Sequence, residues 1–449
     1  MKKIILYILF INIATSQINI KIYNQGLAFI QEERSNDLFN INKQSLQIKP
    51  LPHSIIPSSI NLLSNDIEFL SIEYIYHPIN IKNLLNHNLG NEIELVKYGE
   101  NGKIIYSTKG KLLSNTDIPI FEINNKIVLD PPYEYIFNNI PNNINDHPYI
   151  NCNVNGYSKN SKYNLSYLTE GLYWQAEYNL YLISDNKSSI EGWYSIHNNN
   201  NINYKSTNLS LVSGKININK QNSKFDVSNK AAAFRNTQNF KKPEINKVQE
   251  YFIYNIPNKI TLLKKSQYRY KFLNKDNLKH NITYHVSHNL TRHHWKTPSQ
   301  TSNIPVNTEL ELSASEISDF QMPAGIYNMY NKNENQLTFL GSDSYNIIEG
   351  DDKIKLKIGK SHDIICTFTT NGFKINKNSG KAQVSAIFHN KKNKPVTIKW
   401  IEKLSDGRWE IIDTKQDFTR IDAFHIEFII TIPAQSKKEV SFYAKMEKE

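Results

Sequence analysis

The chain has 449 residues, of which 39% are apolar and 21% charged, and a formal net charge of +11. The length suits roughly three domains with sizeable cores, and a composition with 26 Tyr and 20 Phe is typical of an ordered, strand-rich protein, which excludes global disorder. Nearly all basic residues are Lys and they are scattered, whereas nucleic-acid readers cluster Arg on one face, so no nucleic-acid partner is predicted.

The N-terminus is typical of a secretory signal peptide. Lys2 and Lys3 precede an apolar run over residues 4–14, and small residues follow up to Ser16. The run is shorter than the ~20 apolar residues that span a bilayer, which disfavours the alternative of a retained membrane anchor. We therefore predict a signal peptide over residues 1–16 and an exported protein, periplasmic or extracellular, that is not integral to the membrane after signal removal.

An N-terminal β domain is predicted over residues 17–150. Apolar residues alternate from Ile18 onward, which is the pattern of half-buried strands. One short helix is predicted over 78–89, where Pro78 suits the first turn and Gly90 can end it. After it, residues 92–140 predict a small β-meander with a hairpin at Asn101-Gly102.

A central β-sandwich is predicted over residues 151–335. Its strands are expected near 163–168, 178–183, 192–197 and 250–254, and residues 198–201 are expected to turn the chain. Residues 217–248 are rich in Asn, Lys, Ser and Gln and predict a flexible surface loop.

The C-terminal segment 336–449 predicts an immunoglobulin-like β-sandwich. Period-two alternation is strongest here, with short strands separated by turn residues. The chain as a whole is therefore predicted to be all-β, with several β domains in series, and no short-period internal repeat is evident. The expected buried faces are Val384, Ala386 and Phe388; Val396, Ile398 and Trp400; Phe424, Ile426, Phe428, Ile430 and Ile432; and Val440, Phe442, Ala444 and Met446.

Two cysteines, Cys152 and Cys366, are too few for a disulfide framework and lack metal-ligand spacing. In an oxidising compartment they could pair and close a long loop. Alternatively, Cys366 is a buried small apolar residue, because it alternates with Ile364 and Phe368 on one strand face.

The best candidates for chemistry are four histidines, His285, His288, His293 and His294, because neutral imidazoles are common metal ligands. On a strand, however, His285 and His288 point to opposite faces, as do His293 and His294, so none of these pairs is arranged to hold one ion. These residues are weak metal candidates, and surface histidines near a hairpin are the competing interpretation. No catalytic or cofactor-binding residue is assigned, and no cofactor is predicted.

Known catalytic signatures for serine nucleophiles, zinc proteases and nucleotide binding are absent from the sequence. The acidic pairs Glu32-Glu33 and Asp351-Asp352 could flank a glycosidic bond, but neighbours on a strand diverge in direction. We expect them to be solvated charges at turns or edges.

Three stretches together resemble one known family. They are LSYLTEGLYWQAEY at 165–178; GW at 192–193 with HNN at 197–199 and LSLVSG at 209–214; and MPAGIY at 322–327 followed by LG at 340–341. They resemble the domain of unknown function 4139 family, the mucoidy-inhibitor-like C-terminal domain, and IYNQGLA at 22–28 resembles the start of its short exported bacterial form.

The resemblance implies an exported, β-rich protein without an assigned activity, and no catalytic residue carries over from the family. The family often has a Ser-Gly or Thr-Gly turn where residues 198–201 are all Asn here, so a different turn type is expected. Trp174 and Tyr178 lie four apart on a strand and are predicted to fill a core, the alternative being an exposed platform for a sugar.

Two functions are compatible with these observations. The first is a non-enzymatic binding or scaffold module of the cell envelope, whose partner is an unknown envelope protein or polysaccharide. The alternative is an envelope hydrolase or metal-dependent enzyme that uses residues 285–294. The missing catalytic signatures favour the non-enzymatic function.

Overall fold

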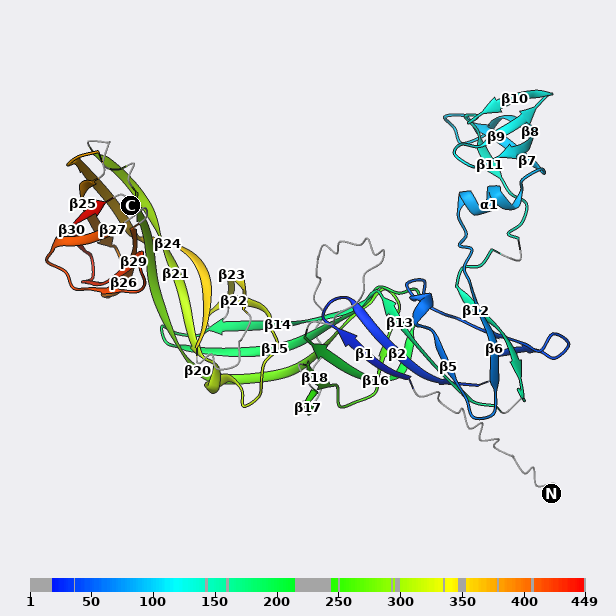
Figure 1. Cartoon of the computed structure of the whole chain (residues 1–449), viewed down its shortest axis with the longest axis horizontal. Coiled ribbons are helices and arrows are strands. Elements are labelled where there is room, and N and C mark those ends of the chain that lie inside the picture. Colours follow the sequence, from blue (N-terminus) through cyan, green and yellow to red (C-terminus); the bar gives the residue numbers. More distant parts are fainter. Residues whose placement is uncertain are drawn as a thin grey trace, which may run out of the picture. The chain divides into compact units, whose positions relative to one another are not determined.

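A computed structural model describes residues 18–35, 37–141, 144–158, 161–214, 244–248, 251–291, 294, 299–333, 336–345, 353–377, 379–404 and 408–447 (Figure 1). Strands dominate this part of the chain, and its helical elements are short, which confirms the predicted all-β class. The predicted signal peptide lies outside the described residues. So do Asp351, Asp352 and residues 217–243 of the predicted loop.

The chain divides into two compact units. Unit 1 holds the described residues up to Trp174, those from Ile196 to 214 and those from 244 to Tyr268, and unit 2 holds Gln175–Ser195 and the described residues from Arg269 onward. The boundaries predicted near 151 and 336 each lie inside one unit. The finer division into three domains stays a prediction.

The largest sheet of unit 1 has eight strands in the order β17-β18-β16-β1-β2-β13-β5, and β19 pairs with β16. Alternate residues of its central strands are buried, as in β13 with Tyr163, Leu165 and Tyr167. Its strands are β1 (Ile18–Tyr23), β2 (Leu27–Arg34), β5 (Asn61–Leu63), β13 (Tyr163–Glu170), β16 (Tyr204–Ser213), β17 (Glu244–Val248), β18 (Tyr251–Asn255) and β19 (Ile260–Leu262).

Two smaller sheets complete unit 1. One has the order β3-β4-β12-β6 and the other β10-β9-β8-β7-β11. The second contains the predicted meander and its hairpin, where Gly102 takes a φ of +72°, which glycine adopts without strain. The strands are β3 (Leu38–Asn40), β4 (Ser45–Ile48), β6 (Glu68–Ile75), β12 (Tyr149–Asn155), β7 (Glu92–Tyr98), β8 (Ile104–Ser114), β9 (Ile120–Ile123), β10 (Lys126–Leu129) and β11 (Glu134–Ile136).

The predicted helix is shorter than expected. Helix α1 spans Ile81–His87, and it begins three residues after Pro78 because the Asn80 side chain accepts a hydrogen bond from the Asn83 backbone N–H at 2.8 Å and caps it. Its Leu85 is buried in the core of the five-stranded sheet. Two short helical turns were not predicted, a 3-10 turn at Pro57–Ser59 and α2 at Ala314–Ile317.

A 13-stranded sheet makes up most of unit 2. The order of its main path is β23-β22-β14-β15-β20-β21-β24-β25-β30-β27; β26 pairs with β20 and β29, and β28 with β29. The strands are β14 (Leu172–Leu182), β15 (Lys187–Asn198), β20 (Ser266–Leu290), β21 (Gln300–Ser313), β22 (Gly325–Asn333), β23 (Gln336–Tyr345), β24 (Lys353–Lys374), β25 (Ser379–Asn390), β26 (Val396–Leu404), β27 (Arg408–Thr414), β28 (Phe418–Arg420), β29 (His425–Ile432) and β30 (Ser436–Glu447).

The core of the C-terminal part gathers around Trp400. Its indole is fully buried, and the rings of Phe368 and Phe428 lie 5.0 and 4.7 Å from it. The predicted buried faces of β25, β26, β29 and β30 all join this core. Phe424 is the exception, since it precedes β29 and is 48% exposed. Trp174 and Tyr178 are also buried, which confirms their predicted role as core residues.

Three further predictions can be compared with the described residues. Glu244–Val248, the end of the predicted loop, forms strand β17 instead, because it pairs with β18 in an antiparallel hairpin that composition does not reveal. Glu32 is buried rather than solvated, since Arg34 donates to its carboxylate at 3.0 Å. Both cysteines are free and buried, so the buried-thiol interpretation of Cys366 is confirmed.

An unusual turn centred on Asn198 follows β15 in unit 1. The Asn198 side chain is 1% exposed, and its amide donates to the carbonyl oxygens of Ile202, Leu262 and Leu263 at 3.0, 3.3 and 2.9 Å. Its own oxygen accepts from the Asn200 backbone N–H at 3.0 Å. One buried side chain therefore ties the start of β16 to the end of β19.

Unit 2 contains a second turn of the same construction. The amide of Asn390, which is fully buried, donates to the carbonyl oxygens of Lys394, Ile432 and Pro433 at 2.9, 3.3 and 2.9 Å. Its oxygen accepts from the Lys392 N–H at 2.9 Å. The match shows that the fold repeats one local structure. We call residues 197–205 with 262–266 the first asparagine turn, and residues 389–397 with 432–436 the second.

The two asparagine turns also agree in the residue that follows the later strand. Lys265 and Gln435 occupy this position with φ values of 53° and 52°. Their backbone N–H groups donate to the carbonyls of Asn200 and Lys392 at 3.3 and 3.1 Å. A positive φ outside glycine is uncommon, so its presence at the same place in both turns supports their equivalence.

The His280 side chain on β20 is a buried polar group. It is 2% exposed, and neither ring nitrogen has a partner among the described residues. Burial lowers its pKa below the ordinary value of 6.5; Lys394 acts in the same direction and Asp185 opposes it. On acidification the unfolded chain binds a proton before the folded chain does. Because of His280, the free energy of unfolding should therefore be highest above about pH 6.5 and should decrease as the pH falls below this value.

We expect His280→Phe to raise the free energy of unfolding at pH 5 by about 1–2 kcal/mol, because it removes two unsatisfied nitrogens and one buried titration. Urea unfolding at pH 5 and pH 7.5 checks this. His285, whose pKa is also lowered by burial, with Glu309 opposing, should leave a smaller acid-side loss of the same sign. If the variant and the parent lose the same stability between the two pH values, His280 has no such role.

Candidate functional site

The predicted histidines do not form one cluster. β20 carries His285 and His288, and its alternation places them on opposite faces of the sheet. His285 lies 2.9 Å from the Thr283 hydroxyl and 3.4 Å from a Glu309 carboxylate oxygen. His293 lies outside the described residues. His288 and His294 are the two that come near each other, with ring centroids 6.1 Å apart.

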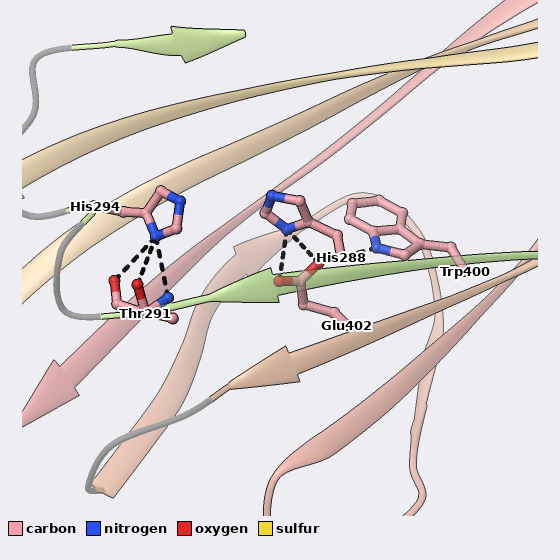
Figure 2. A network of polar contacts seen from close by, with 5 residues as sticks. All are labelled: His288, Thr291, His294, Trp400 and Glu402. Carbon is pink, nitrogen blue, oxygen red and sulfur yellow. Dashed lines mark hydrogen bonds and ion pairs between the residues drawn. The ribbon is translucent and has the colours of Figure 1, made fainter. Parts of the chain in front are cut away.

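A buried polar network surrounds His288 (Figure 2). β20 and β26 pair in parallel, and the register sets His288 beside Glu402. The two carboxylate oxygens of Glu402 lie 2.8 and 2.9 Å from His288 Nδ1. Trp400, two residues earlier on the same face of β26, donates its indole N–H to Glu402 at 3.0 Å. Because a carboxylate only accepts, His288 Nδ1–H is the donor.

The network is enclosed by the unit 2 core. The side chain of Glu402 is fully buried and that of His288 is 8% exposed. The His288 ring stacks on Phe368 with centroids 4.7 Å apart and planes 5° from parallel. A buried carboxylate is costly unless it is paired and hydrogen-bonded, and both conditions are met here. Packing and pairing together fix the imidazole in one orientation.

His294 takes its orientation from Thr291. Its Nδ1 accepts from the Thr291 backbone N–H at 3.1 Å and lies 3.0 Å from the Thr291 hydroxyl. Figure 2 shows the His288 and His294 rings side by side above β20, each held through Nδ1. Nδ1 of His294 also lies 3.2 Å from the Thr291 carbonyl oxygen, so a single residue holds the His294 ring in place.

The chemistry that the His288–Glu402 pair can support is limited. A carboxylate that accepts from Nδ1–H fixes the tautomer and orientation of the imidazole, as it does for metal-bound and general-base histidines. Within the described part of the chain, however, no group of three His, Cys, Asp or Glu residues is placed to hold a metal ion. Within the described residues, the geometry supplies one oriented imidazole.

Neither of two cavities formed by described residues contains this network. One of about 460 Å³ in unit 2 is lined by residues 272–275 and 315–320. The other, of about 370 Å³, lies in unit 1.

Across the described ranges, no helix is both long and apolar enough to cross a membrane.

Glu402 was missed in the sequence, although a pattern could have found it. Val396, Ile398, Trp400 and Leu404 alternate on a buried strand face, and Glu402 occupies the remaining position of that face. A carboxylate in such a series predicts a buried partner. The pattern does not identify the partner of Glu402, because His288 lies on a strand that is distant in sequence.

Comparison with models of known protein families and with curated proteins finds no match for this chain.

Proposed function

We propose that this chain is a non-enzymatic binding or scaffold module of the cell envelope, exported to the periplasm or cell exterior, whose partner is an envelope protein or polysaccharide. The proposal includes membership of the domain of unknown function 4139 family in its short exported form, with an immunoglobulin-like sandwich at the C-terminus. The features that support export and family membership are the N-terminal apolar run and the three stretches quoted above.

The observation that carries the non-enzymatic proposal is the enclosure of the His288 network. Glu402 and Trp400 are fully buried, and His288 is stacked against Phe368. A general base must reach the proton that it abstracts, and substrate sites are normally concave. Polar groups that are paired inside a core are better explained as part of the scaffold.

Co-sedimentation tests the proposal. The purified chain from residue 17 onward is incubated with isolated cell-envelope material at low and high salt, because salt screens exposed charges. Retention at high salt is expected for a specific envelope partner. Loss of all binding at high salt would reduce the interaction to adhesion by the net charge of the chain, and an absence of binding in both conditions would contradict the proposal.

The alternative is an envelope hydrolase or metal-dependent enzyme that uses residues 285–294. The pairing of His288 with a buried carboxylate favours it, since such a pair orients a general base. Turnover of envelope material by the pure protein, lost on replacing the four histidines by glutamine, would support the enzyme. Full turnover by the fourfold variant would place the chemistry elsewhere.

A further inference from the structure

The unit 1 cavity has the size and lining of a small-molecule site. Its volume is about 370 Å³, within the range of about 300–1,000 Å³ that ligand pockets occupy. Its walls come from β1, β2, β13, the first asparagine turn and the positions of Pro50, His147 and Lys264. Most of these residues are polar, so the cavity suits a ligand with many hydrogen-bonding groups.

Buried polar groups form the floor of the cavity. Glu32, Tyr167 and Tyr204 line it and are 8%, 1% and 2% exposed. Arg34, also in the lining, donates to Glu32 at 3.0 Å and lies 3.5 Å from the carboxylate of Asp37. The carboxylate of Glu32 is therefore held in place, and its second oxygen can accept a further hydrogen bond.

The hydroxyl groups of Tyr167 and Tyr204 can act as hydrogen-bond donors in the cavity. Burial raises the pKa of both hydroxyls, so both carry a proton at neutral pH. The Tyr204 hydroxyl accepts from the Asn200 amide at 3.0 Å. Each of the two hydroxyls also has one proton that it can donate to an acceptor in the cavity.

Two lysines at the rim carry positive charge toward the same cavity. Lys205 and Lys264 are exposed lining residues, and neither forms an ion pair with a described residue. By contrast, the neighbouring Lys265 donates its Nζ to the Asn199 carbonyl at 2.6 Å and so belongs to the turn itself. The rim of the cavity therefore has two positively charged side chains, both from the first asparagine turn, that are not paired with a described acidic residue.

The second asparagine turn shows which of these residues the fold requires. Its backbone and Asn hydrogen bonds match those of the first turn, yet Val396, Thr397 and Ala434 stand where the first has Tyr204, Lys205 and Lys264. The turn can therefore be built without the hydroxyl and without either cation. Tyr204, Lys205 and Lys264 line the cavity, and the second asparagine turn has a different residue at each equivalent position. The difference indicates that these three side chains have a role other than folding.

We propose that the unit 1 cavity binds a saccharide unit that bears a negative charge, with its anionic group on Lys205 and Lys264 and its hydroxyls on Glu32 and the Tyr167–Tyr204 pair. This inference rests on the proposed envelope-binding function and names the chemistry of the partner. Sugar hydroxyls both donate and accept, which suits a floor that presents a carboxylate acceptor and protonated tyrosine hydroxyls. Two lysines above them favour an acidic over a neutral sugar.

The test is titration calorimetry of the chain from residue 17 onward with three probes: a short oligomer of a uronic acid, the matching neutral oligomer, and a hexose phosphate. Binding of the uronic acid at least tenfold tighter than the neutral oligomer is expected, and the hexose phosphate shows whether phosphate replaces carboxylate. The preference should shrink as salt rises. Equal affinity for acidic and neutral sugars, or no binding of any probe at millimolar concentration, would overturn the proposal.

The lysine variants replace residues of the first asparagine turn by those at the equivalent positions of the second asparagine turn. Lys205→Thr with Lys264→Ala installs the residues of the second turn, so the fold should persist while affinity for the acidic probe falls at least tenfold. Tyr204→Phe should weaken acidic and neutral probes alike, by about tenfold. Lys265→Gln, also a residue of the second turn, is the matched control and should bind as the parent does.

Envelope co-sedimentation of the same variants separates this inference from the proposed function. If the double lysine variant loses high-salt retention, the cavity is the envelope-binding site. If it keeps full retention while the parent binds no acidic sugar, the cavity proposal fails and the envelope-binding function stands. If the parent itself shows no retention, the envelope function fails whatever the calorimetry gives.

Discussion

Replacing Asn390 by alanine is expected to lower the free energy of unfolding by about 3 kcal/mol. The two N–H groups of the Asn390 amide are shared among three carbonyl oxygens, and its oxygen accepts from the Lys392 N–H, all at a fully buried position. Losing one partner leaves each buried group with its desolvation cost, about 1–3 kcal/mol. Urea unfolding at neutral pH measures the effect.

Asn390→Asp separates hydrogen bonding from packing. Aspartate has the same size and keeps the acceptor for Lys392, but it sets an oxygen against three carbonyl oxygens. We expect it to destabilise at least as much as alanine. Asn274→Ala, at an exposed position of β20, is the control and should change stability by less than about 0.5 kcal/mol. An Asp variant as stable as the parent would refute the role of the amide.

Replacing His288 by phenylalanine should cost about 3 kcal/mol of unfolding free energy. The Phe ring can take over the stacking on Phe368, so the loss isolates the polar interaction. Glu402 would keep the Trp400 N–H as a donor but lose its only basic partner among the described residues, at a position with no exposure. A buried charge without its partner is among the more costly defects in a core.

The double variant His288→Phe with Glu402→Gln is the decisive comparison. The introduced glutamine side chain is uncharged and can still accept from the Trp400 indole, so most of the lost stability should return. A double-mutant cycle of urea unfolding measures the coupling between the two positions. If His288→Phe alone costs less than about 1 kcal/mol, Glu402 is not held by this pair and the structural interpretation of the network is wrong.

The strands were predictable because burial leaves a period-two pattern in the sequence. The faces with Val396 to Trp400 and with Val440 to Met446 show it, and both are buried. The hairpin at Gly102 was predictable from local turn chemistry. These features depend on residues that are adjacent in sequence.

Features that depend on distant segments were not predictable. The Glu402 partner is 114 residues away on β20, and the groups bound by Asn198 include carbonyls 64 and 65 residues away. Asn198 was expected only to turn the chain, since nothing near it in the sequence indicates which carbonyls it binds. The unit 1 cavity was missed for the same reason, because its walls come from segments between residues 18 and 264.

The asparagine turns also bear on the chemical ageing of this asparagine-rich chain. Deamidation begins when the backbone nitrogen of the next residue attacks the side-chain carbonyl of Asn. In both turns that nitrogen is engaged, with the Asn199 N–H donating to Gly171 at 2.7 Å and the Lys391 N–H to Asp363 at 2.8 Å. The Asn side chains are themselves held by four hydrogen bonds each. The two asparagines whose conversion to aspartate would harm the fold most are thus the ones kept from the reactive conformation, and deamidation should accumulate at exposed asparagines instead.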